Sequence, residues 1–282
     1  DSAISCTPSG TQIVISVNSP SLKGYEVSRF WSSRAVQWRC TEARLPLHAS
    51  LNFGASQAAG EWIFFLSDDD VLTDSFKRQF ELSAIGSKTL VAVKHDIIDE
   101  EGNWKRSGRS PQERLLRGED PFRYFLHDRF RFNLSLFITP RKLFESVGGF
   151  KDTGYPNGYF VDTVLHGQLL ARAETVYINR DVALLRRESR TQGSAQFYVG
   201  PEARRYLNLV AKHLWSDAEV NQRLRGLKYN SFSQYRNAIV RKRFRAEWNK
   251  SQSELYRRSR SFRIKLLTYF LLFWPTSLWS KA

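Results

Sequence analysis

An apolar segment that ends in three consecutive carboxylates restricts the possible folds of this chain more than any other feature. Trp62–Leu66 contains only apolar residues, and Asp68, Asp69 and Asp70 follow it after a single serine. An apolar run of this length predicts a short strand that is buried on both faces. Such strands are typical of α/β sheets, in which ligands bind beyond the carboxyl ends of the strands.

The three adjacent aspartates repel one another, so a buried triplet needs a cation among its oxygens. At the end of a buried strand, the expected cation is a divalent metal that also holds phosphate oxygens. The alternative is a solvated acidic turn that caps a helix beginning near Thr73, because aspartate is a favourable N-cap residue. The position directly after the apolar segment favours the metal site.

The first 200 residues alternate between strand-like and helix-like patterns. This alternation predicts an α/β fold with a mixed, mostly parallel sheet that is flanked by helices. Strands are expected at Thr11–Val17, Trp62–Leu66, Thr89–Lys94, Leu134–Thr139, Thr175–Ile178 and Val182–Leu185, and helices at Leu47–Ala59, Ser75–Ile85, Pro140–Val147 and Tyr159–Arg172. Asp99–Asn103 has the composition of a hairpin turn, and Pro111–Arg131 is expected to form helix and loop.

The cysteine content excludes a disulfide scaffold. Cys6 and Cys40 are the two cysteines of the sequence, and they belong to no Cys/His metal-binding pattern. A reducing compartment is therefore expected, and the start of the sequence has no secretory signal pattern. Methionine is absent, even at position 1, so we expect a processed, trimmed or fragmentary chain.

The positive charge is concentrated in the last third of the sequence. Residues 201–282 contain 18 Lys and Arg against 5 Asp and Glu, whereas residues 1–200 contain 25 against 23. This asymmetry predicts two parts, residues 1–200 and a basic helical extension at residues 201–282. A strongly basic extension favours phosphate-rich partners, either nucleic acid or anionic lipid.

The extension ends in an apolar and aromatic segment, residues 264–279, that Pro275 interrupts. This segment is shorter than the roughly 20 residues of a transmembrane helix. Because basic clusters precede it, we expect it to lie in the interface of an anionic membrane. The alternative is a hydrophobic helix that docks on the protein itself. The expected location is peripheral, on the cytoplasmic face of the cell membrane.

Several motifs occur in a characteristic order along the first 200 residues. They are Asn52–Ala55 with Ala58–Trp62, then Phe65–Asp70, then Arg141–Phe144 with Val147–Phe150, and finally Asp162. Their order and spacing resemble those of family 2 glycosyltransferases, which have the GT-A fold. The resemblance covers about residues 10–200. It implies a transfer of sugar from a nucleotide-diphosphate donor.

The sequence departs from the family pattern at its beginning. The family's first strand is not recognised, and Thr11–Val17 resembles the second strand instead. We therefore expect a chain that is truncated at its N-terminus. The family's second strand commonly ends in aspartate, whereas this sequence has Asn18 there. An amide can still bind a base or ribose, but the identity of the base stays open.

The resemblance assigns roles to individual residues. Asp69 and Asp70 are the candidate ligands of Mn²⁺ or Mg²⁺, which would act as a Lewis acid on the diphosphate. Asp162 is the candidate general base in an inverting displacement, with a helix cap as the alternative. Candidates for binding the nucleotide-sugar are Asn18, Asn52, Asp68, Arg186, Arg187 and Arg190, and candidates for the acceptor site are Tyr155, Asn157 and Tyr159.

The function expected from these features is a metal-dependent, hexosyltransferase-type glycosyltransferase. Its acceptor would be a glycan or a lipid-linked molecule in cell-surface polysaccharide synthesis, and nucleic acid is not an expected partner. Two alternatives stay open. A basic nucleic-acid-binding protein would use residues 201–282, but no recognition signature supports it. A metal-dependent phosphohydrolase would need further ligands such as Asp96, Asp99 or Asp162.

Overall fold

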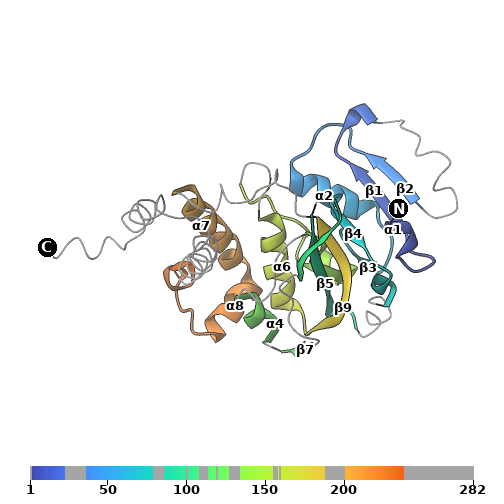
Figure 1. Ribbon diagram of the computed structural model, residues 1–282. Helices are drawn as coiled ribbons and strands as arrows, with labels where there is room; N and C mark the ends of the chain where they lie inside the picture. Colours follow the sequence, from blue (N-terminus) through green and yellow to red (C-terminus); the bar gives the residue numbers. More distant parts are fainter. Residues whose placement is uncertain are drawn as a thin grey trace, which may run out of the picture. The chain divides into compact units, whose positions relative to one another are not determined.

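The computed structural model describes most of the chain before residue 238 (Figure 1). The described residues are 2–22, 36–78, 86–99, 101–107, 114–118, 120–126, 134–154, 158, 160–187 and 201–237. The chain divides into a compact unit, Asp1–Tyr235, and a second unit, Arg236–Ala282. The fold described below is that of the first unit.

A sheet of seven strands forms the centre of this unit. Its strands are β3 (Trp62–Ile63), β4 (Asp70–Leu72), β5 (Thr89–Ile98), β6 (Trp104–Ser107), β7 (Arg114–Arg117), β8 (Phe137–Pro140) and β9 (Thr175–Arg187). The order is β3-β8-β5-β9-β4, with β6 paired to β5 and β7 paired to β9. The sheet is mixed, as expected. The expectation of mostly parallel pairing is wrong for the described strands, because only β5 and β9 pair in parallel in this sheet.

Two strands near the N-terminus form a separate parallel sheet in the described part of the chain. They are β1 (Ile13–Val17) and β2 (Val36–Cys40). Helix α2 (Leu47–Gln57) packs on β1, and Gly54 of the helix lies against Ser16 of the strand. A Cβ atom at Gly54 would lie 3.1 Å from the Cβ of Ser16. The absence of a side chain at this position therefore allows the helix to lie directly on the strand.

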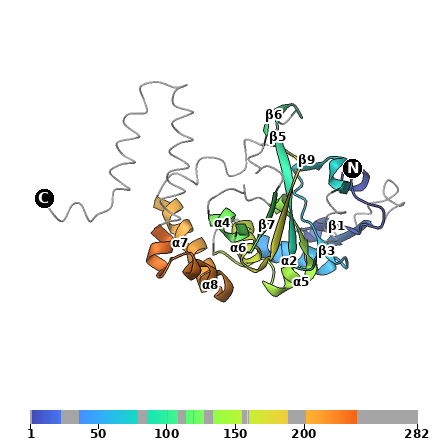
Figure 2. The same ribbon diagram turned by 90° about the horizontal axis from the view of Figure 1, so that it is seen from below.

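Helices lie on both faces of the large sheet (Figures 1 and 2). One face carries α6, with α4, α7 and α8 next to it, and the N-terminal α1 lies on the opposite side. The helices are α1 (Ser2–Ser5), α4 (Asp120–Leu126), α5 (Arg141–Ser146), α6 (Val161–Arg172), α7 (Pro201–Ser216) and α8 (Ala218–Gly226), and short 3-10 turns occur at η1 (Pro20–Leu22) and η2 (Leu134–Leu136).

Successive side chains of β8 contribute to the hydrophobic core on opposite faces of the sheet. Phe137 contacts His166 of α6, with ring centroids 5.0 Å apart. Its neighbour Ile138 belongs to the cluster on the other face, together with Leu72, Phe76 and Leu184. Consecutive strand residues point to opposite faces, so a short apolar strand supplies both halves of the core.

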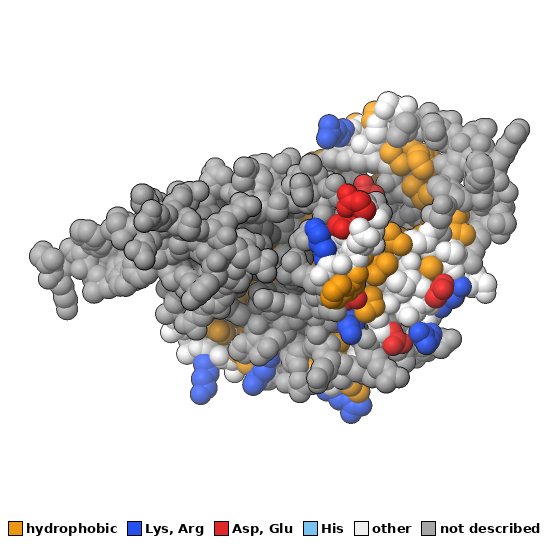
Figure 3. All heavy atoms as spheres, in the orientation of Figure 1, with side chains coloured by type: hydrophobic (Ala, Val, Ile, Leu, Met, Phe, Trp, Pro, Cys, Tyr) orange, Lys and Arg blue, Asp and Glu red, His pale blue; other side chains and the backbone are white. Residues whose placement is uncertain are grey.

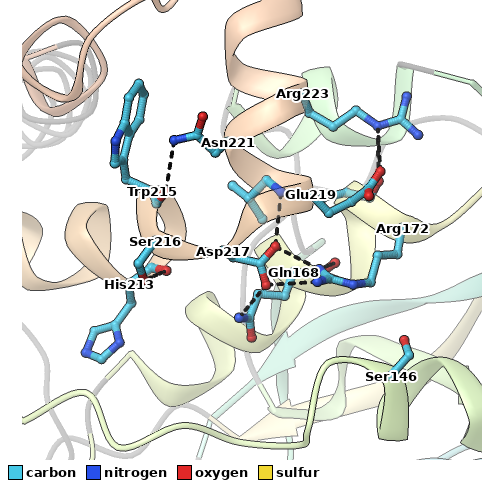
Figure 4. A network of polar contacts seen from close by, with 12 residues as sticks. Ser146, Gln168, Arg172, His213, Trp215, Ser216, Asp217, Glu219, Asn221 and Arg223 are labelled. Carbon is cyan, nitrogen blue, oxygen red and sulfur yellow. Dashed lines mark hydrogen bonds and ion pairs between the residues drawn. The ribbon is translucent and has the colours of Figure 1, made fainter.

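Helices α6 and α8 are joined by a partly buried ion pair (Figure 4). Arg172 donates to both carboxylate oxygens of Asp217 at 3.0 Å, and Gln168 donates to the same carboxylate at 2.9 Å. Asp217 also caps α8 by accepting from the backbone N–H of Val220 at 3.1 Å. The paired geometry is the strong, bidentate form of this contact, and it fixes α8 against the end of α6.

Helices α7 and α8 follow residue 201, where the charge pattern predicted a second part, but they belong to the compact unit. Gly167 of α6 lies against both Leu214 of α7 and Phe125 of α4, since an added Cβ would come within 2.6 and 2.8 Å of them. The basic composition begins at residue 201, but the compact unit continues to Tyr235. The helices after residue 201 therefore contribute to the same hydrophobic core as the sheet.

Most of the expected elements are present, with three corrections. Only Trp62–Ile63 of the expected strand Trp62–Leu66 pairs with a neighbour. Arg114–Arg117 is a strand on the edge of β9 rather than helix or loop. The two expected strands after Thr175 are one continuous strand, β9, because irregular pairing opposite Ala92–His95 accommodates the extra residues.

Candidate functional site

The acidic triplet forms the turn between β3 and β4. Asp68 is exposed, Asp69 is half-buried, and Asp70 begins β4 with 6% of its surface exposed. The backbone N–H of Asp70 donates to the carbonyl of Ser67 at 3.2 Å, which closes the turn. Strand β4, rather than a helix, therefore follows the triplet directly, and the capping alternative for Asp70 is wrong.

Asp70 carries a buried carboxylate. Both of its oxygens are buried, and no hydrogen bond of acceptable geometry reaches them from the described residues. Burial raises the pKa of Asp70 to about 6, although the nearby Ser135 hydroxyl and the Arg186 guanidinium favour the ionised form. Repulsion from Asp69 and Asp68 contributes to this raised pKa.

Of the arginines predicted to bind the diphosphate, Arg186 lies in the same cross-strand row as Asp70. The two residues are register partners across β4 and β9, so their side chains project from the same face of the sheet. Arg187 follows Arg186 as the last residue of β9. Figure 3 shows acidic and basic side chains side by side on the face of the molecule that it draws.

The turn provides oxygen ligands of the kind that a hard divalent cation prefers. No group of three or more His, Cys, Asp or Glu side chains within the described ranges is arranged to hold a metal ion. A Mg²⁺ or Mn²⁺ ion bound through one or two carboxylates and substrate phosphates needs no such group. The buried, unpaired oxygens of Asp70 beside the half-buried Asp69 fit this second arrangement.

Asp162 lies in the first turn of α6. Its Oδ1 accepts from the backbone N–H of Thr163 at 2.6 Å and from the Thr163 hydroxyl at 3.3 Å. The N-cap residue is Phe160, whose φ of 67° is in the left-handed region and whose side chain makes no capping bond. Left-handed backbone costs free energy for a residue with a side chain, so the chain enters α6 through a strained turn just before Asp162.

His166 follows Asp162 by one helical turn but has a different environment. It is fully buried against Phe137, and desolvation lowers its pKa to about 3. The imidazole is therefore neutral at physiological pH. This buried position, against Phe137, is that of a core residue.

The predicted nucleotide ligand Asn52 contacts the loop before α6. Its Nδ2 donates to the carbonyl of Phe150 at 2.9 Å, and its Oδ1 accepts from the N–H of Phe150 at 2.9 Å. Gly149, with a φ of 66°, brings the backbone so close that an added Cβ would collide with Asn52 Oδ1. Both polar groups of the Asn52 amide are thus engaged by the chain itself.

The same helix face contacts the loop at two further points. A Cβ at Gly158, where φ is 69°, would lie 2.6 Å from the Cβ of Leu47. His48 Nδ1 lies 4.0 Å from Asp152 Oδ1. Helix α2 therefore contacts the chain at Asp152 and Gly158, between Gly148–Phe150 (the GGF motif) and Asp162.

Asn18 also uses its amide within the chain. Nδ2 donates to the carbonyl of Leu45 at 2.7 Å, and Oδ1 accepts from the N–H of Leu45 at 2.8 Å and from the Thr41 hydroxyl at 3.3 Å. These bonds join the ends of β1 and β2 to the start of α2. Binding of a base through this side chain would have to compete with them.

Several predicted site residues lie outside the described part of the structure. They are Arg190, Tyr155, Asn157, Tyr159 and the segment 264–279. Their assigned roles stay predictions. Among the described residues, no helix combines the length and the apolar character needed to span a membrane.

Ser135 is a site residue that the sequence did not indicate. It is fully buried in η2, and its hydroxyl accepts from the backbone N–H of Ser67 at 3.1 Å. It therefore joins the acidic turn to the start of β8 and lies close to Asp70. Ser67 and Ser135 are 68 positions apart in the sequence, so no local pattern revealed this contact.

Comparison with known proteins identifies the fold. The crystal structure of S. aureus TarS 1-349 in complex with UDP-GlcNAc superposes with a TM-score of 0.52 at 14% identity, over 82% of this chain and 72% of that chain. The structure of GalNAc-T7 with UDP, GalNAc and Mn²⁺ superposes with a TM-score of 0.50 at 15% identity, over 86% of this chain and 50% of that chain. No curated protein matches the sequence significantly.

These neighbours and the mixed sheet define a GT-A glycosyltransferase fold. Residues 35–148, which include α2, the acidic turn and the start of the GGF motif, match Glycosyl transferase family 2. The match over residues 35–148 agrees with the family that the motifs of the sequence resemble.

Proposed function

We propose that this protein transfers a sugar from a nucleotide-diphosphate donor to a glycan or lipid-linked acceptor, with inversion at the anomeric carbon. The observation that carries the proposal is the acidic turn, in which Asp70 is buried without a hydrogen bond among the described residues and opposite Arg186. A divalent cation would give the Asp70 oxygens a positive partner, and an anionic diphosphate would give the Arg186 guanidinium a negative one. Donors that contain UDP are supported by what the TarS and GalNAc-T7 structures hold.

Asp69 and Asp70 would hold Mn²⁺ or Mg²⁺, and the bound ion would stabilise the negative charge of the departing diphosphate. Arg186 would contribute a fixed positive charge on the face of Asp70. Asp162 would accept the proton of the acceptor hydroxyl, and its place at the beginning of a rigid helix suits a positioned base.

The phosphohydrolase alternative has less support than transfer. It requires additional metal ligands from other strands, and the described residues contain no group of three or more suitable side chains. The match to a glycosyltransferase family over residues 35–148 favours the transferase.

We also propose that the protein works at an anionic membrane surface, on the cytoplasmic side, in the synthesis of a cell-surface polysaccharide. The support is the basic composition after residue 201 and the aromatic run at residues 264–279. A polymer acceptor assembled on a lipid would bring substrate to the same surface.

The enzymatic proposal can be tested with the slow hydrolysis of a UDP-sugar in the presence of Mn²⁺. Removing one electrostatic contact to a developing anion typically costs about 10²–10³-fold in turnover, so Asp69→Ala should lose at least this much. Glu61→Gln, which changes an exposed carboxylate before β3, is the matched control. Unchanged turnover in Asp69→Ala would remove the turn from the mechanism.

A further inference from the structure

Trp104 is the most exposed large hydrophobic residue in the described part of the chain. Its exposed fraction is 64%, against 42% for Leu47 and 41% for Leu115. Single exposed apolar side chains are common and need no functional explanation by themselves. Two further observations distinguish Trp104.

The indole of Trp104 is held by a hydrogen bond. Its Nε1–H donates to Asp96 Oδ2 at 3.1 Å. The other oxygen of Asp96 is buried and receives no hydrogen bond from the described residues. An unpaired, buried oxygen on the half-buried Asp96 costs stability. The hydrogen bond of the other oxygen orients the exposed indole ring.

Trp104 also lies on the face of the sheet that carries α6. Phe137 contacts α6, and Ala92 is the register partner of Phe137. Alternation along β5 then places Asp96 on this face, and the indole bonded to Asp96 lies there too.

Asp162 lies near the same end of this face. Helix α6 is followed by the start of β9, which pairs with the start of β5 at Thr89, so the N-terminus of α6 points toward the opposite end of β5. A helix of 12 residues is about 18 Å long, which corresponds to roughly five or six strand residues. Asp162 is therefore close to the level of Asp96 along the strand.

We propose that Trp104 is a stacking platform for a sugar ring of the acceptor, at a subsite separate from the sugar that is transferred. One face of a pyranose ring presents mainly C–H bonds, which pack on a flat aromatic ring, and a fixed indole provides such a surface at little entropic cost. The subsite rests on the proposed function, since it takes the acceptor to be carbohydrate.

The sheet gives the separation between this subsite and the acidic turn. Ile98 pairs with Trp104 on one side and with Arg187 on the other, and Arg186 pairs with Asp70. Three strand spacings, about 14 Å in the plane of the sheet, thus separate Trp104 from the turn. Asp70 projects from the opposite face, because it alternates in phase with Leu72 of β4. This distance suits an acceptor of several sugar units that extends from the transfer site across the end of the sheet.

The test measures binding of the full chain to an immobilised array of short oligosaccharides, followed by affinities for the glycans that bind. Trp104→Ala should weaken these affinities about tenfold, because a stacked ring loses both its burial and its aromatic contact. Trp104→Phe should retain most of the affinity. Asp96→Ala should give an intermediate loss, since the indole then loses its anchor, and Leu115→Ala serves as the control for an exposed apolar side chain elsewhere.

Binding of UDP with Mn²⁺, measured on the same variants, separates this inference from the proposed function. UDP affinity should be the same for wild type and Trp104→Ala. Equal glycan affinity in Trp104→Ala, or no glycan binding by a wild-type chain that binds UDP, would overturn the subsite. Failure of the wild type to bind any nucleotide would instead count against the proposed donor.

Discussion

Asp70 and its neighbours show how single residues prepare the site. A carboxylate that is buried beside two further carboxylates is an electrostatic cost to the protein alone, and the raised pKa of Asp70 reports that cost. Arg186 in the adjacent strand offsets part of it. The acidic run is evident in the sequence, but the arginine and Ser135 are brought to it by strand pairing across more than 60 residues.

At the residue scale, the neutral His166 makes a prediction about acid stability. Its pKa is lowered to about 3 in the folded protein, whereas an unfolded histidine has a pKa near 6.5. Between these values the unfolded chain binds the extra proton, so the free energy of unfolding must fall as the pH falls. This group alone should remove about 3 kcal/mol between pH 7 and pH 4.

Urea unfolding of wild type and His166→Gln over this pH range measures the effect. The variant should show a weaker dependence on pH, with most of the difference below pH 6. Parallel pH profiles for the two proteins would show that His166 is protonated in the fold and that its assigned burial is wrong.

At the scale of elements, helix α2 supports the loop that leads to the candidate base. Asn52 binds both backbone groups of Phe150, and Gly149 and Gly158 allow the loop to approach the helix. The sequence predicted the helix Leu47–Ala59 and the motif Val147–Phe150 separately. It assigned Asn52 to the nucleotide, because a one-dimensional pattern does not show which polar groups the fold itself will use.

Asn52→Ala should leave the N–H and C=O of Phe150 without partners, at a cost of about 2–3 kcal/mol in the free energy of unfolding. We expect kcat for transfer to fall while the affinity for the donor nucleotide changes little, since the loop carries Asp162 rather than the metal turn. Asn52→Asp, which keeps only the acceptor for the Phe150 N–H, should be intermediate.

Ser56→Ala changes an exposed position of the same helix and controls for an effect on α2 itself. Chemical denaturation, steady-state kinetics and nucleotide titration together distinguish the two roles of Asn52. Weaker nucleotide binding with unchanged kcat would return Asn52 to the nucleotide site.

The strand predictions failed where apolar residues pack in the core without pairing in the sheet, or pair in the sheet without an apolar pattern. Trp62–Leu66 is apolar throughout, yet only its first two residues pair in the sheet. Phe65 packs on Phe144 and Phe150 at centroid distances of 5.6 and 4.9 Å. Ile63 is buried and the other four residues are half-buried, so the prediction of a strand buried on both faces holds only in part. Beyond Ile63, aromatic packing rather than strand pairing holds the segment. Arg114–Arg117 was missed because an edge strand needs no alternating apolar pattern.

At the scale of the whole molecule, the basic C-terminal part suggests a second, electrostatic function. The positive charge follows the compact unit that ends at Tyr235, with clusters such as Arg241–Arg243 directly after it. Each basic residue near an anionic membrane is worth about 1 kcal/mol. Composition alone predicted this division of charge, whereas the extent of the folded unit depended on the packing of α7 and α8.

Replacement of Arg241, Lys242 and Arg243 by Gln should weaken binding to vesicles that contain phosphatidylserine roughly a hundredfold, because three favourable charges are lost. Nucleotide affinity should be unchanged. A chain that ends at Asn237 should lose vesicle binding altogether. Co-flotation with vesicles at low and high salt measures both effects, and salt-independent binding by the triple variant would contradict an electrostatic role.

The central claim is that the turn at Asp68–Asp70 binds a nucleoside diphosphate through a divalent cation. Calorimetric titration of the wild-type chain with UDP and GDP, in Mn²⁺ and again in EDTA, tests it most directly. We predict binding of at least one nucleotide in Mn²⁺ by the wild type and by Glu61→Gln, and a loss of at least about tenfold in EDTA or in Asp69→Ala. Equal affinity in all four cases would contradict the claim.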